Sequence, residues 1–151
     1  MDAKEKLFWC IALPGFGQLL NGKYLKGFVF ILLEIIINVQ ANLNTVILLS
    51  FNGEIAKAIQ QTNYQWLMFY PCLYFFAMWD AFKDAGGGKE SNSFLPFVFL
   101  AYSLTLGVIY SAKFKIFGIL FGPVWLPIVC IIPGLVVGFL VKKVLNKDKF
   151  K

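Results

Sequence analysis

Histidine and arginine are both absent from this 151-residue chain, and charged residues of any kind are scarce. The lack of histidine excludes imidazole-based metal sites and catalytic triads that depend on histidine. The lack of arginine argues against a nucleic-acid partner, because nucleic-acid-binding surfaces are usually rich in arginine with aromatic residues interleaved. All fourteen basic residues are lysine, a usage typical of AT-rich bacterial genomes, and the net charge is +6.

Signatures of enzymes and of cofactor sites are also missing. The three cysteines, Cys10, Cys72 and Cys130, lie far apart inside apolar runs, where small buried thiols are common, and no pair has the spacing of metal ligands. The glycine run 86–88 is not a phosphate-binding loop, because no Lys-Ser or Lys-Thr pair that opens a helix follows it. The sequence therefore predicts no catalytic residue, no cofactor and no metal site.

Apolar residues are present in excess. The chain is 59% hydrophobic, 18% aromatic and only 15% charged, with a mean hydropathy of +0.71. A typical soluble domain is about 45–50% apolar and about 25% charged. Both departures predict an all-α, polytopic transmembrane helix bundle. We expect one integral membrane domain over residues 1–151, with hydrophobic segments at about 7–20, 25–51, 66–82, 94–112 and 116–141.

The first of these segments is too short to cross a bilayer unaided. Segment 7–20 has 14 residues, or about 21 Å of helix, against a hydrocarbon core about 30 Å thick. Pro14 and Gly15 interrupt it, and the stretch 13–27 contains most turn signals of the first half of the chain. We expect a short N-terminal hairpin that re-enters its starting side, with a tilted crossing as the alternative. The other four segments are expected to span fully.

Lysine positions predict the orientation, since cytoplasmic loops carry the excess of basic residues. If segment 7–20 re-enters and the other four segments cross, eleven lysines share one side and three share the other. If it crosses, the division is nine to five. Both arrangements predict a cytoplasmic C-terminus in a bacterial inner membrane, and re-entry separates the charges better. The eleven are Lys4, Lys6, Lys23, Lys26, Lys83, Lys89, Lys142, Lys143, Lys147, Lys149 and Lys151.

Glu34 lies near the middle of segment 25–51, and a charge at the bilayer centre costs at least about 2.5–3.5 kcal/mol. Asn38 and Asn42 follow at intervals of four residues, so on a helix the three side chains form one polar stripe. This intramembrane polar stripe indicates either an ion, proton or headgroup site inside the bundle, or interhelical hydrogen bonds that fix its register.

Asp80 is the second intramembrane candidate, at the end of segment 66–82. Its position next to Trp79 is typical of a membrane interface. We expect it to pair with Lys83 or with a lysine of the turn at 23–26. Alternatively it anchors its segment onto the N-terminal bend.

Four polar residues of the N-terminal bend are candidates for headgroup contacts. Gln18, Asn21, Lys23 and Lys26 would offer donors to a lipid phosphate or an anionic partner, although the same residues suit turn formation and positive charge alone. Further along the chain, two glycine pairs have the small-xxx-small spacing that lets helices approach closely. These predicted helix-packing positions are Gly118 and Gly122, and Gly134 and Gly138.

The bend and the end of segment 66–82 share a pattern with other proteins. The sequences Pro14-Gly15-Phe16-Gly17-Gln18, Asn21-Gly22-Lys23-Tyr24-Leu25-Lys26-Gly27 and Trp79-Asp80-Ala81 resemble small, mostly uncharacterised multi-pass membrane proteins of bacteria. They are also loosely similar to the two-transmembrane-helix domain family, in which a glycine-rich bend joins two short helices and a Trp-Asp pair closes the second. Here the bend is shorter, and Trp-Asp arrives one segment later. The resemblance implies a hairpin-bearing integral membrane protein and no catalytic residue.

Three functions follow as hypotheses. The leading one is a non-enzymatic accessory or assembly subunit, whose helices contact the lipid bilayer and either a second copy or a membrane-protein partner. The alternative is a small transporter or channel-like protein with Glu34, Asn38 and Asn42 along its path. The third is a membrane enzyme that acts on lipid, with Glu34 and Asp80 as its carboxylates.

Overall fold

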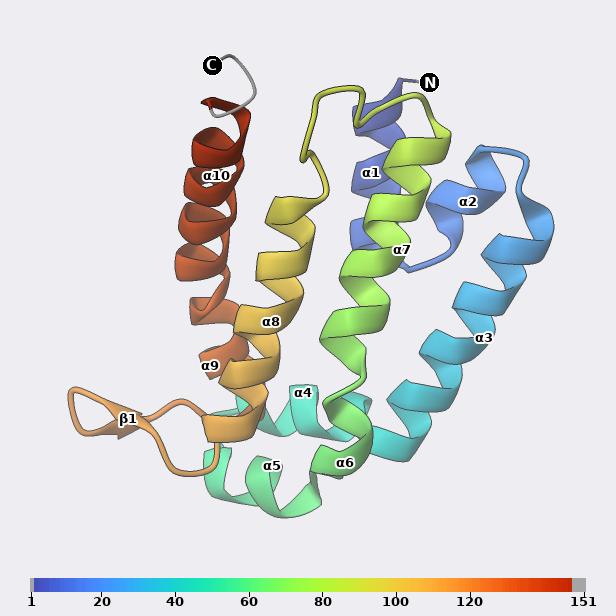
Figure 1. Ribbon diagram of the computed structural model, residues 1–151. Helices are drawn as coiled ribbons and strands as arrows, with labels where there is room; N and C mark the ends of the chain where they lie inside the picture. The colour runs from blue at the N-terminus through green and yellow to red at the C-terminus, as the bar shows by residue number, and fades with distance from the viewer. Residues whose placement is uncertain (1, 148–151) are drawn as a thin grey trace.

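Glycine, proline and asparagine residues divide the apolar runs of this chain into helices of different lengths. The computed structural model describes residues 2–147, and the all-α prediction is confirmed there, apart from one two-stranded hairpin (Figure 1). The elements are α1 (Ala3–Ala12), α2 (Phe16–Leu20), α3 (Tyr24–Ala41), α4 (Leu43–Phe51), α5 (Ile55–Gln61), α6 (Tyr64–Leu67), α7 (Tyr70–Asp84), α8 (Leu95–Tyr110), β1 (Lys115–Ile116), β2 (Ile119–Leu120), α9 (Gly122–Val129) and α10 (Ile131–Lys147).

The longer helices run between two ends of the molecule. The start of α1, the turn between α2 and α3, the linker 85–94 and the end of α10 gather at one end, which we call the terminal end (Figure 1). Helices α4, α5 and α6 and the β-hairpin form the opposite end. Helix α8 is central to the packing, since it contacts α7, α9 and α10.

The N-terminal segment folds back on itself. Helix α1 ends at Ala12 because Leu13 is extended and Gly15 has a φ of 105°, a left-handed conformation that favours glycine. A Cβ at Gly15 would lie 2.5 Å from the carbonyl oxygen of Gly27. Helix α2 then returns to the terminal end, where α1 began (Figure 1). The chain thus forms a helical hairpin over segment 7–20, packed against α7 and α3.

Segment 25–51 is not one continuous helix, and only its first part, Tyr24–Ala41, is a helix long and apolar enough to cross a membrane. Asn42 adopts a φ of 58° and separates α3 from α4. Asparagine tolerates this left-handed conformation better than most residues do. The Asn42 amide donates to the carbonyl oxygen of Gln61 at 3.3 Å, and the Asn63 N–H donates to Ala41 O at 3.3 Å. Helix α4 therefore packs on α5 and α9 at the end of the bundle.

The predicted segment 116–141 also begins differently. Strands β1 and β2 pair in an antiparallel hairpin whose two central residues, Phe117 and Gly118, both have positive φ, as in a type I′ turn. Gly118 therefore lies at a hairpin tip with no atom near its Cβ position, and its predicted helix-packing role is wrong. Gly122 packs against Ile55 at the start of α9, so this pair does not mediate a helix crossing.

The second glycine pair lies at a helix–helix contact. A Cβ at Gly134 would come within 3.0 Å of the Ser103 side chain, and one at Gly138 within 2.7 Å of Pro96 Cα. Both neighbours belong to α8, so these glycines let α10 approach α8 closely. Gly107 of α8 makes a similar close contact with α9, where an added Cβ would lie 2.7 Å from Pro127 Cα.

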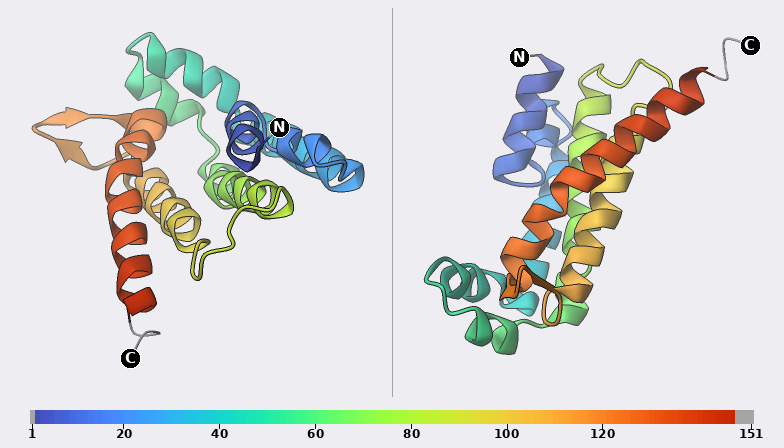
Figure 2. Two further views of the ribbon diagram at one scale, coloured as in Figure 1. Left: turned by 90° about the horizontal axis from the view of Figure 1, so that it is seen from above. Right: turned by 90° about the vertical axis from the view of Figure 1, so that its left-hand side faces the viewer.

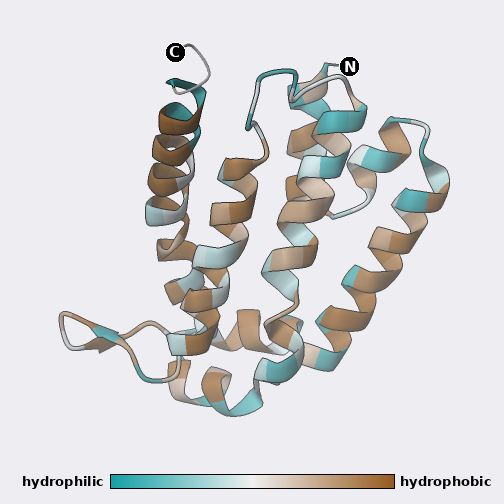
Figure 3. Ribbon diagram, in the orientation of Figure 1, coloured by the Kyte–Doolittle hydropathy of each residue, from teal (hydrophilic) through white to brown (hydrophobic). Residues whose placement is uncertain are grey.

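Two helical stretches in the described part of the chain are long and apolar enough to cross a membrane, fewer than the four full spans expected. They are Tyr24–Ala41 and the run Gly122–Lys147, which joins α9 and α10, while Leu95–Tyr110 is apolar but shorter. Only 28% and 22% of the two windows are buried, so most of their apolar side chains face outward. Figure 3 shows hydrophobic residues along the middle of the helices and hydrophilic ones toward their ends.

Candidate functional site

A buried glutamine fixes the N-terminal hairpin to α7. The Gln18 side chain is 0% exposed, and its amide donates to Ala77 O at 2.8 Å and to Asp80 Oδ2 at 3.1 Å. The Cys10 thiol of α1 lies 3.8 Å from Oε1 of the Gln18 side chain. Because an unsatisfied amide in an apolar interior is costly, these partners determine how α2 docks on α7.

Ion pairs at the terminal end extend this contact to α3. The Lys26 ammonium lies 2.7 Å from Asp80 Oδ1 and 2.9 Å from Asp84 Oδ2. Asn21 donates to Ala81 O at 2.8 Å and accepts from Lys6 at 2.9 Å. We call these residues the hairpin lock, which joins α1, α2, α3 and α7: Lys6, Gln18, Asn21, Lys26, Asp80 and Asp84.

The hairpin lock changes the roles predicted for the bend. Headgroup contact is wrong for Gln18, because its side chain is completely buried against α7. Asn21 and Lys26 both donate to α7, and Lys26, like Lys23, is exposed. Asp80 pairs with Lys26 of the turn, one of the two partners expected for it, and so anchors α7 to the bend. Sequence reasoning expected Asp80 to reach the bend, but it did not place Gln18 in this interface.

Glu34 is the most buried carboxylate among the described residues, at 6% exposure. The hydroxyls of Tyr70 and Tyr74 on α7 lie near it and interact with its carboxyl group. Tyr74 donates to Ile11 O of α1 at 2.7 Å. Within residues 2–147, Glu34 Oε2 has no hydrogen-bond partner. The site is thus a nearly enclosed carboxylate between α3 and α7.

The predicted polar stripe does not continue from Glu34. The Asn38 amide donates to Asn44 Oδ1 at 3.2 Å, at an exposed position. Asn42 has left the helix and donates to Gln61. Because the chain turns at Asn42, this residue leaves the stripe, whereas Asn38 stays one helical turn from Glu34 on α3 and donates to Asn44 instead. Asp80 belongs to the hairpin lock.

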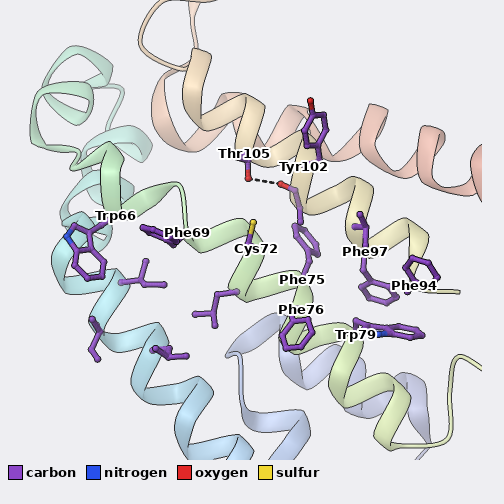
Figure 4. A pocket seen from close by; sticks show the side chains of 16 residues that line it. Trp66, Phe69, Cys72, Phe75, Phe76, Trp79, Phe94, Phe97, Tyr102 and Thr105 are labelled. Carbon is purple, nitrogen blue, oxygen red and sulfur yellow. Dashed lines mark hydrogen bonds between the residues drawn. The ribbon is translucent and has the colours of Figure 1, made fainter. Parts of the chain in front are cut away.

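An apolar groove of about 1070 Å³ lies between α3, α6, α7 and α8 (Figure 4). Seen from above, α3, α7 and α8 stand in a row with α1 on one side of it (Figure 2). The residues that line this lateral groove are Leu33, Ile36, Ile37, Trp66, Phe69, Cys72, Leu73, Phe75, Phe76, Trp79, Phe94, Phe97, Val98, Ala101, Tyr102 and Thr105.

A few small side chains lie among the large ones that line the groove. Cys72 on α7 and Ala101 and Thr105 on α8 are small, and aromatic rings such as those of Trp66 and Trp79 stand around them (Figure 4). The Thr105 hydroxyl donates to Ala101 O at 2.8 Å, so it is already satisfied. The groove consequently offers shape and apolar area with little hydrogen bonding.

The groove was not predicted from the sequence, because four separate elements build it. The only signal was the density of aromatic residues in segments 66–82 and 94–112. Groups of three or more potential metal ligands are not found in the described range 2–147. Comparison of the chain with protein-family models, with curated proteins and with solved structures finds no match.

Proposed function

We propose that this chain is a multi-pass membrane protein that acts as a non-catalytic subunit, holding an apolar transmembrane helix of a partner protein in its lateral groove. The observation that carries the proposal is the groove itself, which is large, open at the side of the bundle and almost without polar atoms.

Membrane insertion is supported by the exposed apolar surface. Leu25 is 81% exposed, and Phe28, Val39, Ile132 and Leu140 are exposed as well. Soluble monomers rarely present contiguous apolar surface on this scale. A bilayer removes the free-energy cost of exposing these apolar side chains to water, because lipid tails surround them instead.

The proposed topology has four crossings, by α3, α7, α8 and the α9–α10 run, with α1 and α2 as a re-entrant hairpin. Helices α7 and α8 have 15 and 16 residues, or about 22–24 Å, so the bilayer would thin or flanking residues would extend them. Elements at the terminal end carry nine of the described lysines, and those at the opposite end carry three. The positive-inside rule then puts the terminal end in the cytoplasm of a bacterial cell.

A helix suits the groove better than a polar ligand does. Small-molecule sites usually combine apolar walls with a few convergent polar groups, which this groove lacks. Transmembrane helices associate by close packing, and small residues at the contact permit it. Cys72 on α7 and Ala101 and Thr105 on α8 supply such positions in the groove.

Filling the groove tests this function. Ala101→Trp places an indole where the partner helix would pack. The amount of a stoichiometric partner that co-purifies in mild detergent should therefore be about tenfold lower for this variant than for the unaltered protein. The measurement is quantitative mass spectrometry of the purified complex. The matched control is Val136→Trp, on the exposed face of α10, which should keep the partner. Equal recovery with Ala101→Trp, or recovery of no partner helix by the unaltered protein, would refute the proposal.

Ion transport is a second candidate function, favoured by the unpartnered oxygen of buried Glu34. If Glu34 carries protons or cations, Glu34→Gln should abolish flux in liposomes, since an amide neither becomes negatively charged nor takes up and releases a proton. Under the helix-binding proposal, neither protein conducts and Glu34→Gln keeps its partner. Glu54→Gln, at the opposite end of the bundle, is the control. Flux by the unaltered protein that vanishes only with Glu34→Gln would favour transport.

A further inference from the structure

A second cavity lies on the other side of α7 and α8, at the terminal end. It measures about 460 Å³, within the range of about 300–1,000 Å³ typical of small-ligand sites. Leu7 of α1 and Leu135 and Phe139 of α10 form two of its walls. Helix α10 packs on α8 and diverges from α1, so the cavity lies between them (Figure 2). Phe139 is 55% exposed, so this wall reaches the outer surface of the bundle.

The rim of this cavity carries one charge of each sign. The Lys142 ammonium lies 2.6 Å from Glu90 Oε2, and both residues line the cavity. The Lys142 side chain is 18% exposed, whereas that of Glu90 is 78% exposed. The hydrogen bond from Lys142 lowers the pKa of Glu90 below its usual value, so Glu90 is a carboxylate at neutral pH.

Hydrogen bonds hold the linker 85–94 in a position that places Glu90 at the rim of the cavity. Asn146 of α10 donates to Ser91 O at 3.2 Å and accepts from the Asn92 amide at 2.9 Å. Ser93 donates to Gly88 O at 2.9 Å, which closes the linker on itself. The two opposite charges are therefore held beside an apolar chamber by the fold.

We propose that this cavity binds one phospholipid whose headgroup carries a phosphate and a primary amine, with an acyl chain inside the cavity, the phosphate on Lys142 and the amine on Glu90. The inference rests on the proposed membrane insertion, but it does not depend on the lateral groove.

Charge complementarity identifies this lipid class. Lysine binds phosphate as a point charge, and basic pockets between transmembrane helices bind lipid headgroups. A lipid with phosphate alone would leave the Glu90 carboxylate beside another negative group. A quaternary ammonium has no N–H to donate, so it would lose the hydrogen bond that a primary amine makes with Glu90. The position at the lysine-rich terminal end matches the depth of a cytoplasmic-leaflet headgroup.

The test counts retained lipid by native mass spectrometry. The full chain is reconstituted with equal amounts of phosphatidylethanolamine, phosphatidylglycerol and phosphatidylcholine, and then extracted in mild detergent. We expect one phosphatidylethanolamine to be retained in preference to the other two. Lys142→Met should lower that retention about fivefold, the loss of one lysine–phosphate attraction. Lys143→Met, an exposed neighbour that does not line the cavity, should leave it unchanged.

Two further variants separate the parts of the site. Glu90→Gln should keep the bound lipid but abolish the preference for a primary amine over choline, and Leu135→Trp should exclude the acyl chain. Equal retention of all three lipids by the unaltered protein, or full retention by Lys142→Met, would overturn the inference. Ala101→Trp, which fills the lateral groove, should retain the lipid. Failure of the groove proposal is therefore distinguishable from failure of the lipid-binding inference. Loss of the protein from washed membranes would instead refute membrane insertion itself.

Discussion

Replacing Gly17 with valine is expected to detach the N-terminal hairpin from α7. A Cβ at Gly17 would lie 2.7 Å from the Ala81 Cβ and 2.8 Å from the backbone oxygen of Lys6, and it would also overlap the Cys10 sulfur. Overpacking usually costs about 1–3 kcal/mol, and backbone atoms on one side leave little room to relax. We expect Gly17→Val to destabilise hairpin docking by about 3 kcal/mol.

The buried Cys10 thiol reports this detachment directly. With Cys72 and Cys130 replaced by serine, Cys10 should react slowly with a maleimide in the unaltered hairpin, since it is fully buried. A loss of about 3 kcal/mol corresponds to labelling on the order of 100-fold faster. The control is Gly22→Asn in the same bend, where no atom lies within 4 Å of the Cβ position and asparagine tolerates the positive φ. Similar labelling rates for the two variants would show that close packing at Gly17 is unimportant.

Replacing Gln18 with leucine is expected to lower the melting temperature by about 5–15 °C. Leucine fills a similar volume but cannot donate, so Ala77 O and Asp80 Oδ2 each lose a hydrogen bond. A bond to a charged group contributes about 1.5–3 kcal/mol and one to a neutral carbonyl about 1 kcal/mol. The free energy of unfolding should fall by about 2–4 kcal/mol, which gives the stated shift for a chain of this size.

The shift is measured by tryptophan fluorescence during heating in mild detergent. Gln65→Leu is the matched control, because Gln65 is exposed and such substitutions change stability by about 0.5 kcal/mol at most. Lys26→Met tests the rest of the hairpin lock, where the Lys26–Asp80 pair is partly exposed and contributes less, about 0–1 kcal/mol. A melting temperature for Gln18→Leu within about 1 °C of the unaltered protein would contradict the role of the buried amide.

Part of the fold was predictable because local signals dominate it. Pro14 and Gly15 predicted the end of the first helix, and the structure shows it there, since neither residue readily continues a helix. The spacing of Gly134 and Gly138 predicted a close helix contact, and α8 supplies the partner. Other breaks were missed. Asn42 has no neighbouring glycine or proline, and its polar neighbours Gln40 and Asn44 do not by themselves mark a turn, so its left-handed conformation was not predicted.

The candidate sites were less predictable, because they join residues far apart in the chain. Glu34 was identified as the unusual carboxylate, but its carboxyl group interacts with Tyr70 of α7, and Asn38 of its own helix donates to Asn44. Asp80 was expected to reach the N-terminal bend, but its buried contact with Gln18 was not predicted. Glu90 and Lys142 gave no signal at all, since 52 residues separate them.

By itself, the sequence determined that this chain is helical and strongly apolar, that it bends near Gly15, and that its lysines group at particular turns. Those features depend on composition and on neighbours along the chain, which a sequence contains. Tertiary structure alone decided that Gln18 is an anchor rather than a surface contact, that α3 stops at Ala41, and that four elements enclose the lateral groove. Burial and cavity shape arise only when distant segments pack together, and local propensities do not specify that packing.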